Sequence, residues 1–250
     1  MVKYMNKKKL YLSTIANDCY TVAKEYGLGI EIAEFCTAWN MDDEFDKTDK
    51  KLKANLEGID RVVLHAPFNE LFPCAIDKKA RELAKFRYKS AIELANRYNA
   101  HKVIIHGGYN PYIYYPRWYV DESVVFWKGF LKEIPSDTQI LLENVLEETP
   151  NLLCDIVKGV GDDRLKLCLD IGHVNAYSKV SVSDWLEYCG KYISHFHIHN
   201  NDGSSDSHSP INDGNINMNE FFLLADKLCS DATYTLEITS VFDSVKVLLK

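Results

Sequence analysis

The chain has 250 residues, of which 46% are hydrophobic and 26% charged, and this suits one large globular domain or two small ones. Its formal net charge of −7 gives no support for tight nonspecific binding to nucleic acid, although a local basic groove remains compatible with it. The seven cysteines are widely spaced without a CxxC pair, and the first lysines precede no apolar stretch, so we expect a cytoplasmic protein without disulfides, signal peptide or membrane span.

Eight short runs rich in apolar and β-branched residues recur along the chain, and each predicts a β-strand. They span residues 10–14, 29–35, 61–67, 102–108, 139–144, 165–173, 193–201 and 234–239. Most are continuous apolar runs rather than alternating ones, which is typical of parallel strands that are covered on both faces.

Longer segments with helical spacing lie between these runs. The clearest is 77–100, where Asp77 is a candidate N-cap and one stripe carries Ala80, Leu83, Ala84, Tyr88, Ala91, Leu94 and Ala95. Residues 121–134, 149–160 and 218–229 repeat the pattern more weakly. This alternation, without a linker, predicts one α/β domain over residues 1–250, a single-domain (β/α)8 TIM barrel. An open doubly wound sheet is the alternative, but it rarely needs eight similar strands, and no GxGxxG occurs.

Six consecutive strand ends carry an imidazole or a carboxylate. These residues are His65, His106, Glu143, Asp170, His197 and Glu237. The steps between them are about one βα repeat, and the C-terminal ends of barrel strands form the mouth where active sites lie. Charges gathered there are costly unless they are paired or hold a cation. A nitrogen and oxygen ligand set without thiolate favours Zn, Mn, Fe or Co over a structural cysteine site.

Residues 195–208 contain four of the eight histidines in the chain. His195, His197 and His199 alternate along the predicted seventh strand, so they share one face. We expect His197 to join the metal ligands, His195 to be hydrogen-bonded deeper in the barrel, and His199 to lie at the rim, where it can touch substrate. Asp206 and His208 follow in one loop and can chelate a further metal together with His173.

The tyrosine-rich loop 109–119 follows the predicted fourth strand and overhangs the mouth. One interpretation is a substrate lid, in which Tyr109 and Trp118 stack on a base or sugar and Arg117 binds a phosphate. The other is packing on neighbouring loops or on the partner in a homodimer. Glu31 and Glu34, near the second strand end, have two interpretations as well: substrate contact, or a structural or solvated role.

The motifs around these residues resemble those of a known family. They read LHAPF, IIHGG, LLENV, CLDIGHVNAYS, FHIHNN, DSH and LEIT. They are similar to segments of the xylose isomerase-like TIM barrels, a superfamily that includes endonuclease IV-type enzymes (AP endonuclease family 2) and sugar phosphate isomerases and epimerases. The resemblance covers most of the chain.

The resemblance to the endonuclease IV branch implies up to three zinc ions on nine ligands. By this match the first ion is held by His65 and His106, with Glu143 bridging to the second. The second ion is completed by Asp170, His197 and Glu237. The third is held by His173, Asp206 and His208. The resemblance to the epimerase branch implies instead one Mn or Mg ion on Glu143, Asp170, His197 and Glu237, with Glu143 and Glu237 as the acid/base carboxylates.

The epimerase branch needs only four ligands, whereas this chain has residues that match all nine of the endonuclease IV branch. The leading prediction is therefore a metal-dependent hydrolase of a phosphoester or phosphodiester. HGGYNP replaces the HPG signature of the repair enzymes, and Ile171 and Gly172 stand where those enzymes usually carry Thr-Cys. DNA is therefore a possible but unfavoured substrate, and we expect a small phosphorylated or sugar molecule. The alternative is a sugar (phosphate) isomerase or epimerase that moves a proton beside a carbonyl through Glu143 and Glu237. A third reading is a non-catalytic metal-binding barrel.

Overall fold

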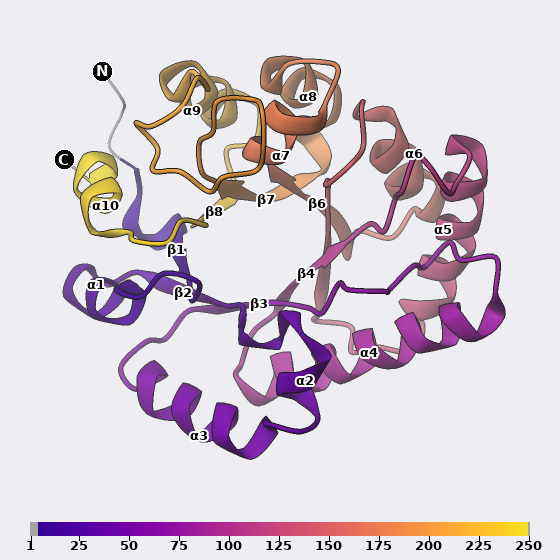
Figure 1. Ribbon diagram of the computed structural model, residues 1–250, viewed down its shortest axis with the longest axis horizontal. Helices are drawn as coiled ribbons and strands as arrows, with labels where there is room; N and C mark the ends of the chain where they lie inside the picture. The colour runs from indigo at the N-terminus through magenta and orange to yellow at the C-terminus, as the bar shows by residue number, and fades with distance from the viewer. Residues whose placement is uncertain (1–4, 250) are drawn as a thin grey trace.

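Eight parallel strands form a closed barrel in the computed structural model, which describes residues 5–249. They pair in sequence order, and the last strand returns to pair with the first (Figure 1). The strands are β1 (Leu10–Ser13), β2 (Gly29–Ile32), β3 (Val62–His65), β4 (Lys102–His106), β5 (Gln139–Glu143), β6 (Leu165–Asp170), β7 (Ile193–Ile198) and β8 (Thr233–Leu236). The (β/α)8 TIM barrel predicted from the sequence is confirmed.

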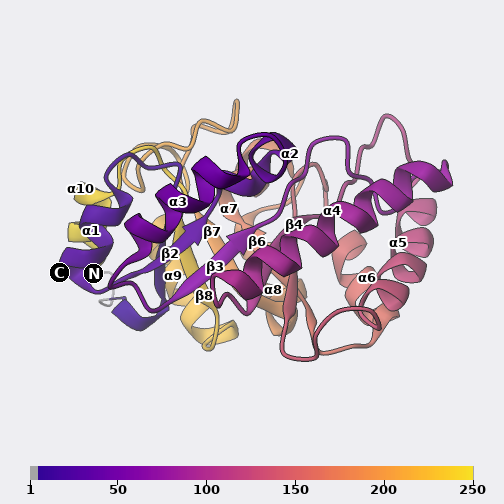
Figure 2. The ribbon, with the colours of Figure 1, turned by 90° about the horizontal axis from the view of Figure 1, so that it is seen from below.

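Helices surround this barrel on its outer side (Figures 1 and 2). Within the described residues they are α1 (Cys19–Tyr26), α2 (Ala38–Met41), α3 (Phe45–Leu56), α4 (Lys78–Arg97), α5 (Pro116–Phe130), α6 (Asn151–Val160), α7 (Ile171–Tyr177), α8 (Val182–Cys189), α9 (Met218–Leu228) and α10 (Phe242–Leu249). In residues 5–249 no helix has both the length and the apolar character needed to cross a bilayer.

All eight strands end one to three residues earlier than the sequence predicts. Strand β6 stops at Asp170, whose side chain accepts a hydrogen bond from the His173 amide and so caps α7. Strand β2 stops at Ile32, and β7 stops at Ile198. His199 therefore follows the seventh strand instead of lying on it.

Helix α4 is close to its prediction. Asp77 caps it by accepting a hydrogen bond from the Lys79 amide. Its buried face includes Ala84, Tyr88 and Ala91 as expected. Leu83, predicted on the same stripe, is instead exposed, because the buried face turns toward Ile92.

Helix α5 begins five residues before the predicted start at 121. Pro116 occupies its first turn, where the missing amide proton costs nothing and the fixed backbone angle favours the helix. Arg117 and Trp118 therefore belong to a helix, and the loop prediction for them is wrong.

The barrel strands face two different cores. Side chains that point outward, such as Leu12, Ile30 and Leu142, join the main core beneath the helices. Inward side chains alternate with them, and five form a separate apolar cluster inside the barrel: Tyr11, Val63, Ile104, Leu141 and Cys168. These five come from β1 and β3–β6, so the apolar filling covers only part of the barrel interior.

Candidate metal centre

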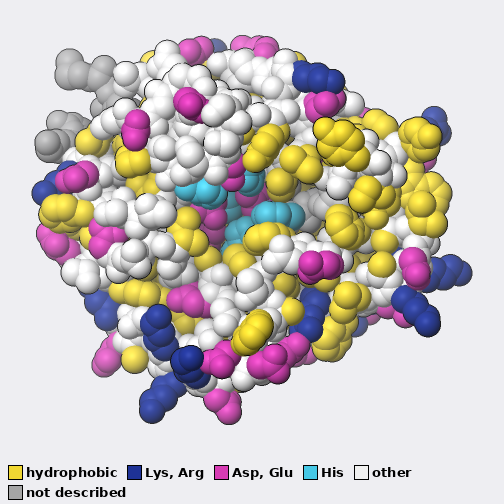
Figure 3. Space-filling view, in the orientation of Figure 1, with side chains coloured by type: hydrophobic (Ala, Val, Ile, Leu, Met, Phe, Trp, Pro, Cys, Tyr) yellow, Lys and Arg dark blue, Asp and Glu magenta, His cyan; other side chains and the backbone are white. Residues whose placement is uncertain are grey.

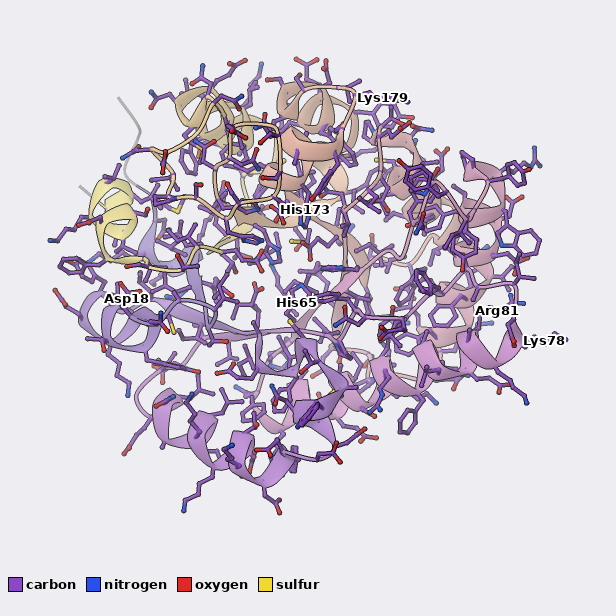
Figure 4. The ribbon with its side chains drawn as sticks, in the orientation of Figure 1. Asp18, His65, Lys78, Arg81, His173 and Lys179 are labelled. Atoms are coloured by element: carbon purple, nitrogen blue, oxygen red, sulfur yellow. The ribbon has the colours of Figure 1, made fainter. Side chains whose placement is uncertain are left out.

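A cavity of about 450 Å³ opens at the C-terminal ends of the strands. Its wall is formed by Ile15, Ala33, Cys36, His65, Phe68, His106, Glu143, Val145, Leu146, His173, Tyr177, Asp206, His208 and Glu237. Figure 3 shows histidine and acidic side chains gathered in the central hollow of this face. Figure 4 labels His65 from β3 and His173 from α7 on either side of the barrel centre.

Four side chains at the C-terminal ends of four successive strands meet beside this cavity. One ligand atom each of Glu143, Asp170, His197 and Glu237 lies within 4.8 Å of the others. The His197 Nδ1 atom is 3.0 Å from Glu237 Oε2, 3.1 Å from Glu143 Oε1 and 3.8 Å from Asp170 Oδ2. A cation about 2.1 Å from each ligand separates neighbouring ligand atoms by about 3.0–3.5 Å. The spacing therefore suits a single divalent ion.

The second oxygen of Glu143 faces two further histidines. Its Oε2 atom is 3.1 Å from His65 Nε2 and 3.4 Å from His106 Nε2, while Oε1 faces His197. One carboxylate thus presents its two oxygens to two different groups of imidazoles. This is the arrangement expected of a carboxylate that bridges two cations.

A third group lies at the edge of the cavity. The Nε2 atoms of His173 and His208 are 3.2 Å and 3.1 Å from the same oxygen of Asp206. His208 adopts a positive φ of 46°, which is uncommon for a residue with a side chain. Strained backbone of this kind often persists at functional sites. The structure thus brings all nine predicted ligands to one end of the barrel.

Hydrogen bonds determine which nitrogen of three histidines faces the acids. The Nδ1 atoms of His65, His173 and His208 lie 2.9, 2.8 and 2.7 Å from backbone carbonyl oxygens. Because a carbonyl only accepts, Nδ1 carries the proton and a neutral ring presents the Nε2 lone pair to a carboxylate oxygen. Two lone pairs face each other favourably only with a cation or an extra proton between them. Metal-binding histidines usually donate their other N–H in this way, so the donor set fits divalent cations.

The carboxyl groups of the cluster are held in their ionised form. Burial raises the pKa of Glu143, but His197 and His106 outweigh it and hold that pKa well below its usual range. The pKa of Glu237 is also lowered, since His197 outweighs burial. For Asp170 the surrounding imidazoles outweigh burial and lower the pKa to about 2. These groups are therefore ionised at neutral pH, which is the state that binds a cation.

His199 lies between Asp170 and the third group, where its Nε2 atom is 3.5 Å from Asp206 Oδ1 and its ring stacks on His208 with centroids 4.2 Å apart. It is fully buried, and its Nε2 atom is 3.0 Å from Asp170 Oδ1. Helix α7 packs against the His199 ring at Gly172, where a Cβ atom would overlap the imidazole. His199 thus contacts Asp170 and the third group without belonging to the cavity wall, and its contact with substrate stays a prediction.

The predicted lid residues lie outside the cavity wall. Tyr109 is buried and packs against Tyr119 at 4.8 Å between ring centroids. Arg117 is exposed and lies 3.3 Å from Asp121 on its own helix. Trp118 donates to the Cys74 carbonyl at 2.9 Å. These contacts match the packing interpretation, and a substrate role for the three residues stays a prediction.

Both glutamates near β2 have protein partners. Glu34 accepts hydrogen bonds from the hydroxyls of Thr14 and Tyr20. Glu31 is fully buried inside the barrel and contacts His195 and His197. The sequence allowed a structural role for each, and these contacts agree with that role.

The apolar part of the wall escaped the sequence reasoning. Phe68 stacks on His106 with ring centroids 4.3 Å apart, and Val145, Leu146 and Tyr177 face the same space. Phe68 closes the LHAPF motif and the two aliphatic residues follow Glu143, so their positions just beyond strand ends were the available signal. The cavity therefore combines an ionic floor with an apolar wall.

Comparison with known proteins gives a consistent family. A family model described as xylose isomerase-like TIM barrel matches residues 21–243. An uncharacterized protein of Methanocaldococcus jannaschii, MJ1311, is 32% identical over 213 residues, which cover 79% of this chain and 72% of that protein.

Solved structures agree with this match. The crystal structure of a D-tagatose 3-epimerase-like protein is 25% identical, with a TM-score of 0.77 over 95% of this chain and 93% of that chain. The IolI protein, solved with a zinc atom, is 17% identical with a TM-score of 0.74 over 96% and 95% of the two chains. At that identity, the second likeness establishes the shared fold alone.

Proposed function

Because this chain belongs to the xylose isomerase-like TIM-barrel family, we propose that it is a metal-dependent isomerase or epimerase of a ketose. The observation that carries the proposal is the meeting of Glu143, Asp170, His197 and Glu237 beside a cavity with a largely apolar wall. The likeness to a D-tagatose 3-epimerase-like protein supports the same reaction class. The proposal is thus the reaction that the sequence analysis gave as its alternative, and it replaces phosphoester hydrolysis as the leading function.

The roles of the residues follow from their chemistry. A divalent ion, Mn, Mg or Zn, held by the four side chains would polarise a substrate carbonyl and so acidify the neighbouring C–H group. Of the three carboxylates in the cavity wall, Asp206 is paired with His173 and His208, which leaves Glu143 and Glu237 to move the proton. One would remove it as a carboxylate from the carbon beside the carbonyl, and the other would first take up a proton from substrate or solvent and then return it to the opposite face. Asp170 and His197 keep the two carboxylates at a fixed separation.

The wall of the cavity favours a sugar without phosphate. Among residues 5–249, the cavity wall includes no lysine or arginine, the residues that usually bind a phosphate group. Phe68 and Tyr177 add aromatic surface to this wall, which suits the C–H surface of a sugar. We therefore place the substrate among free ketoses, and phosphorylated sugars become the less favoured class.

Solvent hydrogen exchange tests the proposal even though the particular ketose is unidentified. The purified protein is stripped with chelator, reloaded with Mn²⁺, Co²⁺, Mg²⁺ or Zn²⁺, and incubated with free ketopentoses and ketohexoses in D₂O. Deuterium beside the carbonyl, detected by NMR, is the expected result with at least one ketose. No exchange with any sugar and any metal would refute the proposal.

Hydrolysis of a small phosphoester or phosphodiester is the second candidate. Two further groups outside the four-residue site favour it. His65 and His106 face Glu143, and His173 and His208 face Asp206. Elemental analysis separates the two candidates, since one ion per chain supports the isomerase and about three support the hydrolase. Turnover of bis-p-nitrophenyl phosphate without sugar exchange would establish the second.

A further inference from the structure

One side of the barrel interior is polar. The Glu31 carboxylate lies at the centre of this polar side, and the proposed reaction does not use it. The apolar interior cluster comes from β1 and β3–β6, whereas β2, β7 and β8 contribute Glu31, His195 and Thr235 to the interior. All three are fully buried. Glu31 does not belong to the cavity wall, so it has no access to substrate. A buried carboxylate is costly, and its contacts should indicate its purpose.

The Glu31 carboxylate lies directly between His197 and the polar residues below it. His197 Nε2 is 3.0 Å from Oε1 and 3.2 Å from Oε2, with hydrogen-bond geometry to Oε2. The Thr235 hydroxyl donates to Oε2 at 2.6 Å. His195 Nε2 lies 3.4 Å from the same oxygen. Glu31 is thus fixed from below and turned toward one imidazole above it.

His197 differs from three other histidines of the cluster in the direction of its ring. His65, His173 and His208 donate Nδ1–H to a backbone carbonyl and turn Nε2 toward the acids. His197 is reversed: its Nδ1 faces Glu143 and Glu237, and its Nε2 faces Glu31. Its hydrogen-bond acceptor is therefore an ionisable side chain, where the other three use the backbone.

We propose that Glu31 is a positioning residue that accepts the Nε2–H of His197 and thereby presents the Nδ1 lone pair of that ring to the divalent cation. An acceptor on the far nitrogen fixes the tautomer and the ring orientation, and a carboxylate also makes the ligand more basic. The inference rests on the proposed metal site but does not depend on which reaction the site performs.

Cobalt affinity of the otherwise complete chain tests the inference. Metal-free wild type, Glu31→Gln and Glu31→Leu are titrated with Co²⁺ against a chromophoric chelator, and the visible spectrum of bound Co²⁺ reports the ligand field. Outer-sphere partners of metal-binding histidines typically contribute about 10- to 100-fold in affinity. We expect Glu31→Gln to bind about tenfold more weakly than wild type, and Glu31→Leu, which also removes the acceptor, about a hundredfold more weakly.

Thr233→Val is the matched control, because it deletes a polar group of the same interior without touching His197. The Thr233 hydroxyl contacts His195 Nδ1 at 2.5 Å and Lys102 Nζ at 3.0 Å. We expect this variant to lose some thermal stability and to keep the cobalt affinity and spectrum of wild type. A merely structural role of Glu31 would give its variants this same result.

The outcomes distinguish the inference from the proposed function. Wild type that binds no Co²⁺ refutes the metal site and the inference with it. Wild-type affinity in folded Glu31→Gln and Glu31→Leu refutes the inference alone. Should both variants fail to fold, long-range ¹H–¹⁵N spectra of Zn²⁺-loaded wild type decide: a proton on His197 Nε2 supports the inference, and a proton on Nδ1 overturns it.

Discussion

Replacing Glu143 by glutamine should remove most of the metal affinity while the barrel still folds. Glu143 faces His197 through one oxygen and His65 and His106 through the other. The variant keeps the shape of the side chain but loses its charge. Outer-sphere changes alone cost about 10- to 100-fold in affinity, so loss of a direct ligand should cost at least about a hundredfold.

The loss of affinity converts into a measurable thermal shift. At a free Co²⁺ concentration of about 100 times the wild-type Kd, binding stabilises the wild type by about 2.7 kcal/mol, which raises the Tm of a chain of this size by about 5–11 °C. For a variant that binds about a hundredfold more weakly, the same concentration contributes about 0.4 kcal/mol, or about 1–2 °C. The difference far exceeds the error of a thermal scan.

Scanning calorimetry with and without Co²⁺, together with elemental analysis, measures both effects. Glu147→Gln is the matched control. Glu147 is a buried carboxylate four residues after Glu143 and lies outside the cavity wall. It accepts hydrogen bonds from the Tyr119 hydroxyl and the Val145 amide. We expect the control to retain the wild-type shift with Co²⁺. A full shift in Glu143→Gln as well would show that Glu143 does not hold the ion and would refute the ligand scheme.

Three further predictions follow from the same contacts. Gly172→Ala should lower the free energy of unfolding by more than about 2 kcal/mol, because the new methyl group overlaps the His199 ring; chemical denaturation measures this, and an unchanged midpoint would contradict the packing. Hydrogen bonds from Arg97 hold the pKa of Asp49 below its ordinary value, so the stability that Asp49 contributes is complete above about pH 4 and is lost as the pH falls through the native pKa. Asp49→Asn should therefore destabilise the protein by about 1 kcal/mol at pH 7, and the difference should shrink in urea titrations at pH 3. Treatment with EDTA should lower the Tm of protein purified with its metal, and an identical Tm after dialysis would argue against a resident ion.

The fold was predictable because each strand corresponds to a short run rich in apolar and β-branched residues. Continuous apolar runs such as 103–105 and 140–142 are buried on both faces and could not be confused with amphipathic helix. Boundaries were less predictable, since they depend on caps and turns. Asp170 looks like the end of a strand and also serves as the first cap of a helix, and the sequence pattern cannot say which role begins at which residue.

The convergence of the candidate ligand residues was predictable for a related reason. Parallel barrel strands bring their C-terminal ends together, so residues one repeat apart must converge whatever the details of packing. The side chains that only support the ligands carried no such signal. His199 was expected to touch substrate at the rim, and the structure buries it against Asp170 and Asp206. The contacts of Glu31 join β2 to β7 and appear only when the barrel closes.

The orientation of the histidines argues for a cation independently of the family. If the cluster were only a network of ion pairs, each imidazole would need a second proton to bond its carboxylate, and as many protons as imidazoles would have to be held in a buried space. On His65, His173 and His208 the Nδ1–H group already donates to a backbone carbonyl. The open question for each ring is therefore whether its Nε2 atom carries a proton or faces a cation. A divalent ion in each of the two groups, one at Glu143 and one at Asp206, would replace these protons and satisfy several acceptors at once. Neutron or NMR detection of Nε2 protons on all three rings in metal-saturated protein would therefore contradict cation binding at these groups.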